Sequence, residues 1–126
     1  MPAFELELVV AALRRDGSSS VIDPEPGRPV RIDGFSVGAP LMTSNAPHRG
    51  EMHPDGDELL YLVSGRIDVI IEDGVNEETV GAERVESLRP GQAVLVPRGV
   101  WHRVDVQVPS RLVHITPGPG GSHRPL

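Results

Sequence analysis

The sequence predicts an all-β domain, built as an antiparallel sandwich or barrel, on two observations. From Pro29 onward, short apolar stretches alternate with turn dipeptides such as Asp33-Gly34 and Pro90-Gly91, a spacing typical of short strands joined by tight turns. The chain also contains 14 glycines and 13 prolines in 126 residues. That share suits a turn-rich β protein and argues against a helical bundle.

The N-terminal residues 4–15, FELELVVAALRR, fit two interpretations. The alternation of apolar and acidic residues at the start of this segment is typical of a strand. The Ala, Leu, Glu and Arg content, followed by Asp16-Gly17, indicates a short helix that ends at a glycine, and we favour the helix. Residues 17–29 are expected to form a loop that is interrupted by Val21-Ile22.

Strands account for most of the remaining chain, and turn signals separate them. We expect the Glu-rich residues 74–86 to form an exposed connection, and residues 118–126 to form a flexible tail because they are rich in glycine and proline. Residues 1–117 then form a single domain with a barrel core at about 30–116. The predicted strands are residues 30–32, 35–37, 59–63, 67–71, 93–96, 100–108 and 111–116.

Composition and charge exclude several classes of function. The chain has no cysteine, which excludes disulfides, thiolate metal sites and a cysteine nucleophile, and it has no lysine for Schiff-base chemistry. Its formal charge of −6 disfavours nucleic acid as a partner. No apolar run reaches the ~20 residues of a membrane helix, and the N-terminus lacks the basic start of a signal peptide. We therefore expect a cytoplasmic protein that binds neither nucleic acid nor membrane.

Strand alternation directs polar side chains toward the interior. His102 shares the face of the valines in residues 100–108, and Glu51 and His53 share one face because they lie two residues apart. Glu58 stands at the head of an apolar run, on the same face as its inward leucines. Buried charges are costly unless they are compensated. These groups therefore either face water or face each other across a cation.

Two motifs resemble those of the cupin family. Residues 51–65, EMHPDGDELLYLVSG, align with the first cupin motif, G-x5-H-x-H-x3–4-E-x6-G, and residues 91–102, GQAVLVPRGVWH, align with the second, G-x5-P-x-G-x2-H-x3-N. The resemblance covers about half of the chain and implies a small double-stranded β-helix, or jelly-roll barrel. Cupins commonly bind a divalent metal through three histidines and one glutamate. Carried over position by position, the implied ligands are Glu51, His53, Glu58 and His102.

Three positions depart from the cupin motifs. Asn45 stands at the opening glycine, Glu51 at the first histidine and Val106 at the closing asparagine. Imidazole and carboxylate groups both bind first-row divalent ions, and two glutamates balance a 2+ charge. The oxygen donors shift the expected ion away from copper and toward Fe, Mn or Zn.

Neighbouring polar residues leave alternatives for the ligand set. Asp57 replaces Glu58 as a ligand if the turn before Glu58 is shifted by one residue. His48 is an alternative to Glu51. His114 lies in the last strand, where a position in the cavity or at the surface fits equally well. The histidine of the tail, His123, is expected to lie outside the site.

The resemblance implies a small metal-dependent enzyme with dioxygenase, isomerase or decarboxylase chemistry on a small oxygenated molecule. The alternative is a non-catalytic module that binds a sugar or an organic acid. Cupins of this size commonly pair, so we also expect a homodimer, with the apolar segment 4–13 as the candidate contact. The other interpretation of that segment is an intramolecular cover over the barrel.

Overall fold

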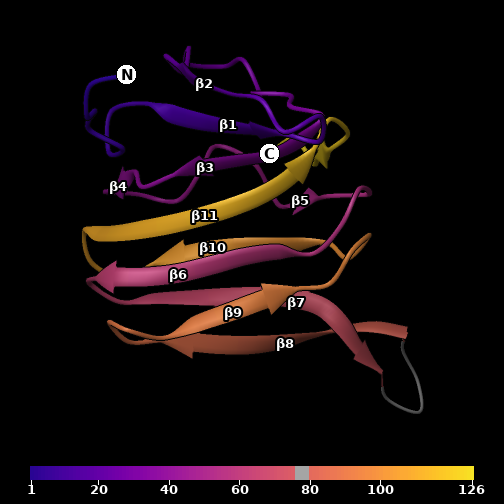
Figure 1. The fold of residues 1–126 in the computed structure, drawn as a ribbon. Helices are drawn as coiled ribbons and strands as arrows, with labels where there is room; N and C mark the ends of the chain where they lie inside the picture. The colour runs from indigo at the N-terminus through magenta and orange to yellow at the C-terminus, as the bar shows by residue number, and fades with distance from the viewer. Residues whose placement is uncertain (76–79) are drawn as a thin grey trace.

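The regular structure consists of β-strands alone in the residues that the computed structural model describes, 1–75 and 80–126 (Figure 1). Within these residues no helix has the length and apolarity that a membrane crossing requires. The strands are β1 (Val10–Arg14), β2 (Ser19–Ile22), β3 (Gly34–Gly38), β4 (Leu41–Met42), β5 (Glu51–Met52), β6 (Glu58–Ser64), β7 (Ile67–Val75), β8 (Val80–Leu88), β9 (Ala93–Val96), β10 (His102–Val106), β11 (Ser110–Gly118) and β12 (Ser122–His123).

The strands form two antiparallel sheets. The larger sheet has the order β2-β1-β3-β11-β6-β9, with β4 also pairing with β11, and the smaller sheet has the order β12-β5-β10-β7-β8. From β5 to β12 the chain crosses repeatedly from one sheet to the other, with β7 and β8 as the one hairpin kept within a sheet. This crossing between two facing sheets is the jelly-roll arrangement. The predicted all-β jelly roll is confirmed.

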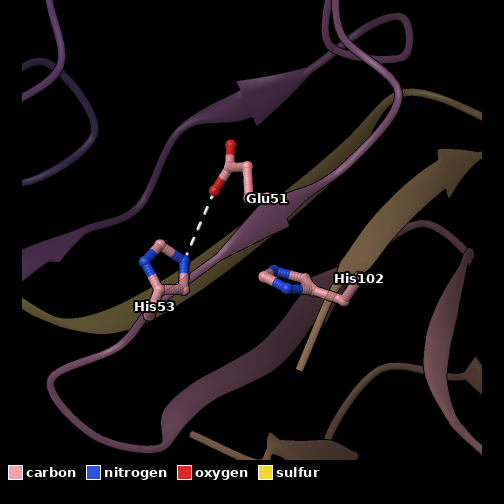
Figure 2. A group of neighbouring side chains, drawn as sticks. All are labelled: Glu51, His53 and His102. Atoms are coloured by element: carbon pink, nitrogen blue, oxygen red, sulfur yellow. Dashed lines mark ion pairs between the residues drawn. The ribbon is translucent and has the colours of Figure 1, made fainter. Parts of the chain in front are cut away.

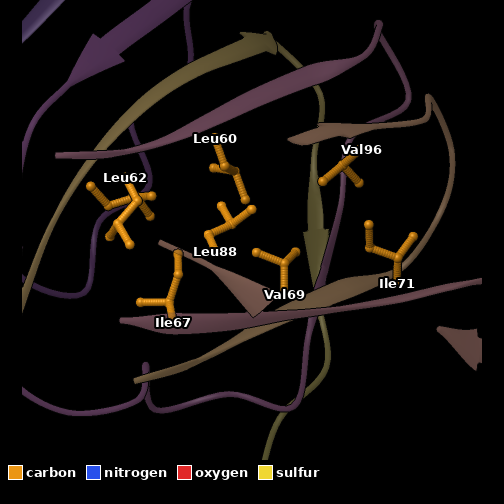
Figure 3. Close-up of a cluster of buried hydrophobic side chains, with 8 residues drawn as sticks. Leu60, Leu62, Ile67, Val69, Ile71, Leu88 and Val96 are labelled. Carbon is orange, nitrogen blue, oxygen red and sulfur yellow. The ribbon is translucent and has the colours of Figure 1, made fainter. Parts of the chain in front are cut away.

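The hydrophobic core lies between the two sheets (Figure 3). Strand alternation explains its composition, because every second residue of β6 and β7 points to the space between the sheets. Valine, leucine and isoleucine fill this space, as the scarcity of aromatic residues requires. The buried cluster consists of Leu60, Leu62, Ile67, Val69, Ile71, Leu88, Val96 and Leu112.

Truncation of Leu62 tests the placement of this core. Leu62 is fully buried, so Leu62→Ala is expected to lower the free energy of unfolding by about 2–5 kcal/mol through lost burial and a residual cavity. The measurement is urea unfolding followed by circular dichroism. Leu41 is 51% exposed, and Leu41→Ala is the matched control, expected to cost less than about 0.5 kcal/mol. Equal losses in the two variants would contradict the placement.

The helix predicted for residues 4–15 is wrong. Val10–Arg14 form strand β1, which pairs with β2 on one side and β3 on the other. Val10 and Ala12 are buried and Leu13 is half exposed, so burial alternates from one residue to the next, as in a strand. Pairing with two strands and burial of one face outweigh the small differences in helix propensity among these residues.

Other strand predictions were confirmed in part. The predicted strands at 59–63, 67–71, 93–96 and 111–116 correspond to β6, β7, β9 and β11, whereas no strand forms over residues 30–32.

The exposed connection predicted for residues 74–86 is wrong for residues 74–75, which belong to β7, and for residues 80–86, which belong to β8. Residues 76–79 lie outside the described part of the chain. β8 is an edge strand, and its charges are accommodated by ion pairs, Arg84 with Asp73 and Glu83 with Arg103.

The C-terminal residues 118–126 differ from the flexible tail that was expected. Ser122 and His123 form β12, which pairs with β5. Backbone hydrogen bonds join Arg124 to Gly50 and to Arg49, so the segment is fixed by the main chain and needs no apolar side chains of its own. The Arg124 guanidinium also pairs with Glu72 at 2.7 Å and lies 4.1 Å from the ring centre of Trp101.

Candidate metal centre

Three segments of the chain carry the four candidate ligands to one place between the sheets. Figure 2 shows three of them, Glu51, His53 and His102. Glu51 begins β5, Glu58 begins β6 and His102 begins β10. Glu51 and His102 are paired neighbours in the smaller sheet, so their positions are fixed by the register. His53 follows β5 at the start of the turn that leads to β6, and its carbonyl accepts a hydrogen bond from the N–H of Gly99.

Gly50 allows β5 to lie close to β10. Its φ of +135° is a conformation that side chains rarely adopt, and a Cβ atom there would lie 3.1 Å from the carbonyl oxygen of His102. The backbone that places Glu51 beside His102 therefore depends on a glycine at this position.

The four side chains contact one another in the structure. His102 Nε2 lies 2.9 Å from Glu58 Oε1, and His53 Nε2 lies 3.3 Å from Glu58 Oε2 and 3.4 Å from Glu51 Oε2. Glu51, His53 and His102 each offer one ligand atom, and these three atoms lie within 4.8 Å of one another. The side chains of Glu58 and His102 are 5% and 4% exposed, whereas that of Glu51 is 40% exposed, so the cluster runs from the interior to a cavity mouth.

The electrostatics of the cluster favour ionised carboxylates. Burial opposes ionisation of Glu58, but the imidazoles of His102 and His53 outweigh it and hold the pKa of Glu58 well below its usual range. Burial also opposes ionisation of Glu51, and contact with His53 overcomes it and lowers the pKa of Glu51. For His53, burial acts to lower the pKa, whereas Glu51 and Glu58 raise it to about 9. At neutral pH a proton on His53 therefore partly offsets the two negative charges.

Buried atoms without hydrogen-bond partners show that the residues fit a metal ion. Within the described residues, His53 Nε2, Glu58 Oε1 and His102 Nδ1 are buried and have no hydrogen-bond partner. The short contacts between these groups lack hydrogen-bond geometry, and a buried polar atom left unpaired costs about 1–3 kcal/mol. Nitrogen and oxygen donors of this kind are ligands for first-row divalent ions.

A chain of hydrogen bonds from β11 holds Glu58 in place. The Thr116 hydroxyl donates to Glu58 Oε2 at 2.6 Å, so its oxygen accepts the proton of His114 Nδ1 at 2.8 Å. Burial lowers the pKa of His114 and so favours its neutral ring, in which the bond to Thr116 places the proton on Nδ1. A Cβ atom at Gly38 would lie 2.5 Å from His114 Nε2, so glycine provides the room for the ring. Sequence analysis missed Thr116, although it shares the inward face of His114 in the last strand.

The structure distinguishes the alternatives for the ligand set. Asp57 is exposed and its carboxylate accepts a hydrogen bond from the N–H of Arg98 at 2.8 Å, so it lies outside the cluster. Glu58 has the inward orientation that its position in the apolar run predicts, with 4% of its surface exposed. His48 does not replace Glu51: its Nε2 lies 2.8 Å from Glu51 Oε1 and holds that carboxylate at the cavity mouth.

Two further histidines line the same cavity. His114 lies on its inner wall. His123, which was expected to lie outside the site, also lines the cavity, and its ring centre is 6.1 Å from that of His48. This placement follows from the pairing of β12 with β5, which a sequence rich in glycine and proline did not reveal.

The cavity around the cluster has a volume of about 1150 Å³. Apolar side chains such as Val10, Leu60 and Leu112 form one side, and the C-terminal residues 120–124 form another. Arg31 fixes this second wall by donating to the carbonyl oxygen of Pro119 at 3.0 Å. The cavity is therefore large enough for a small organic molecule beside the cluster.

Two of the three residues that differ from the cupin motifs, Asn45 and Val106, contact each other. Asn45 Oδ1 accepts a hydrogen bond from the N–H of Val106 at 2.7 Å, and Asn45 Nδ2 donates to Asp105 Oδ1 at 3.3 Å. This contact fixes the end of β10 and leaves the cluster itself untouched.

A family model described as a cupin domain matches residues 43–116, more than half of the chain. A comparison with curated proteins finds no match. Among solved structures, the chain is similar to an oxalate oxidase in complex with the substrate analogue glycolate. The TM-score is 0.57 and the identity is 18%, over 71% of this chain and 45% of that chain.

Two other solved structures are similar and are described with metals. A hydroquinone 1,2-dioxygenase in complex with Cd²⁺ and 4-hydroxybenzonitrile has a TM-score of 0.53 and 20% identity, over 66% of this chain and 57% of that chain. The oxalate decarboxylase of Bacillus subtilis, studied for its Mn(II) centres, has a TM-score of 0.56 and 17% identity, over 71% of this chain and 24% of that chain. This chain thus spans from a quarter to somewhat over half the length of these proteins, and such low identities show a common fold alone.

Proposed function

The chain belongs to the cupin family, and on that premise we propose that it binds one divalent metal ion through Glu51, His53, Glu58 and His102. We further propose that it is an enzyme of dioxygenase or isomerase type that acts on a small oxygenated molecule. The observation that carries the proposal is the convergence of the four side chains at the buried end of the cavity, with unpaired donor atoms on His53, Glu58 and His102.

The donor set favours Fe(II), Mn(II) or Zn(II). Two carboxylates neutralise a 2+ ion, so the buried site would carry no net charge once His53 loses its proton. Oxygen donors make the site less suited to copper, which prefers softer ligands. The Mn(II) and Cd²⁺ reported for similar structures support a first-row or related divalent ion.

The residues of this chain would orient both ion and substrate. Thr116 contacts Glu58 and His48 contacts Glu51, so that the two carboxylates keep their positions. The apolar wall of the cavity, which includes Leu60 and Leu112, would contact the carbon atoms of the substrate and exclude water. The bound ion supplies a Lewis acid for substrate oxygen atoms or a site that activates dioxygen.

Turnover is tested with metal-loaded protein and a panel of small substrates. Protein loaded with Fe(II), Mn(II) or Zn(II) is incubated with hydroxy acids, diketones and thiols, while oxygen consumption and products are followed by electrode and mass spectrometry. We expect turnover with the wild type and none with His102→Ala. Metal binding without turnover of any substrate would contradict the enzymatic proposal and favour the non-catalytic binding of a sugar or an organic acid.

Metal binding is expected to release a proton and to weaken as the pH falls. The pKa of His53 is raised to about 9, so its ring is protonated at pH 7 and must lose that proton to bind an ion. Titration calorimetry with Mn²⁺ in two buffers of different ionisation enthalpy should give about one proton per ion. The apparent affinity should rise about tenfold per pH unit between pH 6 and 8. An affinity independent of pH in this range would show that His53 is not a ligand.

A further inference from the structure

The lining of the cavity differs in charge from the chain as a whole. Among the described residues, five arginines and five aspartates or glutamates line the cavity, so its lining is neutral while its histidines are neutral. A bound ion of charge 2+ leaves a surplus of two positive charges there, whereas the whole chain carries −6. A cavity with this surplus attracts an anionic ligand.

The carboxylates of the lining are already engaged. Glu72 pairs with Arg124 at 2.7 Å, and Glu83 pairs with Arg103 at 2.9 Å. Asp105 accepts a hydrogen bond from a side-chain amide at 3.3 Å. The other two carboxylates belong to the proposed metal centre, where a divalent ion would neutralise them. The positive surplus therefore lies on the arginines that these groups do not pair with.

Three arginines of the lining remain, and they differ in their partners. Arg28 pairs with Glu25, outside the cavity, at 3.5 Å. Among residues 1–75 and 80–126, no carboxylate lies within ion-pair distance of Arg31 or Arg49. Asp55 reaches the same wall as Arg31, but its carboxylate accepts the N–H of Gly120 at 2.6 Å instead. Arg31 and Arg49 thus carry the positive charge that a ligand can meet.

Backbone carbonyl groups hold the guanidinium of Arg31 in a fixed position. Its Nη1 donates to the carbonyl oxygen of Pro119 at 3.0 Å, and Nη1 and Nη2 each lie 3.5 Å from the carbonyl oxygen of Gly121. A guanidinium has five N–H donors, and these two oxygens accept only part of them. Its planar fork matches the two oxygen atoms of a carboxylate. Arg31 is therefore positioned to bind one.

Gly121 places this guanidinium beside a residue of the metal centre. A Cβ atom at Gly121 would lie 3.7 Å from His53 Nδ1 and 3.9 Å from Arg31 Nη1, so both nitrogens lie within 4 Å of one point. The other nitrogen of the ring, His53 Nε2, faces Glu51 at 3.4 Å (Figure 2). The guanidinium and the proposed metal centre thus lie beside the two nitrogens of one imidazole ring.

We propose that the substrate is a small hydroxy or oxo acid whose carboxylate binds Arg31, while the oxygen atoms at its other end face the metal centre. The inference rests on the proposed function and narrows its substrate class from oxygenated molecules to carboxylic acids with two separated polar ends. The carbon atoms between these ends would contact the apolar wall of the cavity. A neutral sugar would leave the positive surplus of the cavity without a counter-charge.

Titration calorimetry with malate and its 4-monoamide tests the proposal. The two ligands share the hydroxy acid end and differ only in the distal carboxylate, which the amide replaces without its charge. The protein is loaded with Zn(II), and its metal content is measured first. We expect the wild type to bind malate at least about tenfold more tightly than the monoamide, because only malate forms the charged contact with Arg31.

Variants of the cavity arginines assign the contact. Arg31→Gln should weaken malate binding about tenfold and change the affinity for the monoamide less than about twofold. Arg31→Lys keeps the charge without the fork and should lose less than Arg31→Gln does. Arg28→Gln is the matched control, because it removes a cavity charge that already has a partner, and it should bind malate as the wild type does.

Several outcomes would overturn the proposal. They are no malate binding by the wild type, equal affinities for malate and the monoamide, or an Arg31→Gln protein that keeps its affinity for malate. Equal losses of both ligands in Arg31→Gln would show that Arg31 only supports the wall. If the wild type holds no metal, the proposed function fails. The same titrations of the metal-free protein then still decide the role of Arg31, because its contact with the carboxylate does not include the ion.

Discussion

Glu58→Gln is expected to abolish stoichiometric metal binding and to lower the free energy of unfolding of the metal-free protein by about 3–5 kcal/mol. Glu58 is 4% exposed and contacts both imidazoles, so the amide removes the charge that compensates a protonated His53 in the interior. The shape of the side chain and its bond from Thr116 are retained. The loss is therefore electrostatic, and removal of one partner from a buried ion pair is strongly destabilising.

Asp57→Asn is the matched control for Glu58→Gln. It neutralises the adjacent carboxylate, which is exposed and lies outside the cluster. Titration calorimetry gives the metal stoichiometry, and urea unfolding gives the stability of the metal-free proteins. Full metal binding by Glu58→Gln, or loss of binding by Asp57→Asn, would show that the ligand at this turn has been misidentified.

Deletion of residues 119–126 is expected to weaken both the fold and the metal centre. The deletion removes β12, the backbone bonds from Arg124 to Gly50 and Arg49, and the ion pair with Glu72. Several lost hydrogen bonds at about 0.5–1.5 kcal/mol each lower the free energy of unfolding by about 2–4 kcal/mol. Because β12 pairs with Glu51, the metal affinity should fall at least about tenfold.

Arg124→Ala separates the contribution of one side chain from that of the strand. It removes the ion pair with Glu72 and the contact with Trp101 while retaining the backbone of β12. We expect a loss of about 1 kcal/mol and little change in metal affinity. Unchanged stability and affinity of the truncated protein would mean that the C-terminal segment does not support the site.

The all-β fold could be predicted from the sequence because turn signals and apolar stretches are local. The observed bounds of strands β6 and β9 agree with the predicted bounds to within one residue. Gly65 and Gly91, which have positive φ, mark the turns beside these strands. The N-terminal segment could not be assigned in the same way. Ala12 and Leu13 fit a helix by propensity, and only their pairing with β2 and β3 makes the segment a strand.

The core of the candidate site could also be predicted, since alternation placed His102 and Glu58 inward and both are buried. The residues that hold the cluster in place could not be predicted from the sequence. Thr116 reaches Glu58 across 58 positions of sequence, and His123 reaches His48 only through the pairing of β12 with β5. Such contacts depend on strand register, which has no local signal in the sequence.

The metal content of purified protein tests the central claim most directly. Wild type, His102→Ala and His123→Ala are dialysed against Mn(II), Fe(II) or Zn(II), freed of excess ion and measured by elemental analysis. We predict one ion per chain for the wild type and for His123→Ala, whose side chain lies at the cavity mouth, and none for His102→Ala. A wild type that retains no ion under any of these conditions, or a His102→Ala protein that retains a full equivalent, would contradict the metal centre.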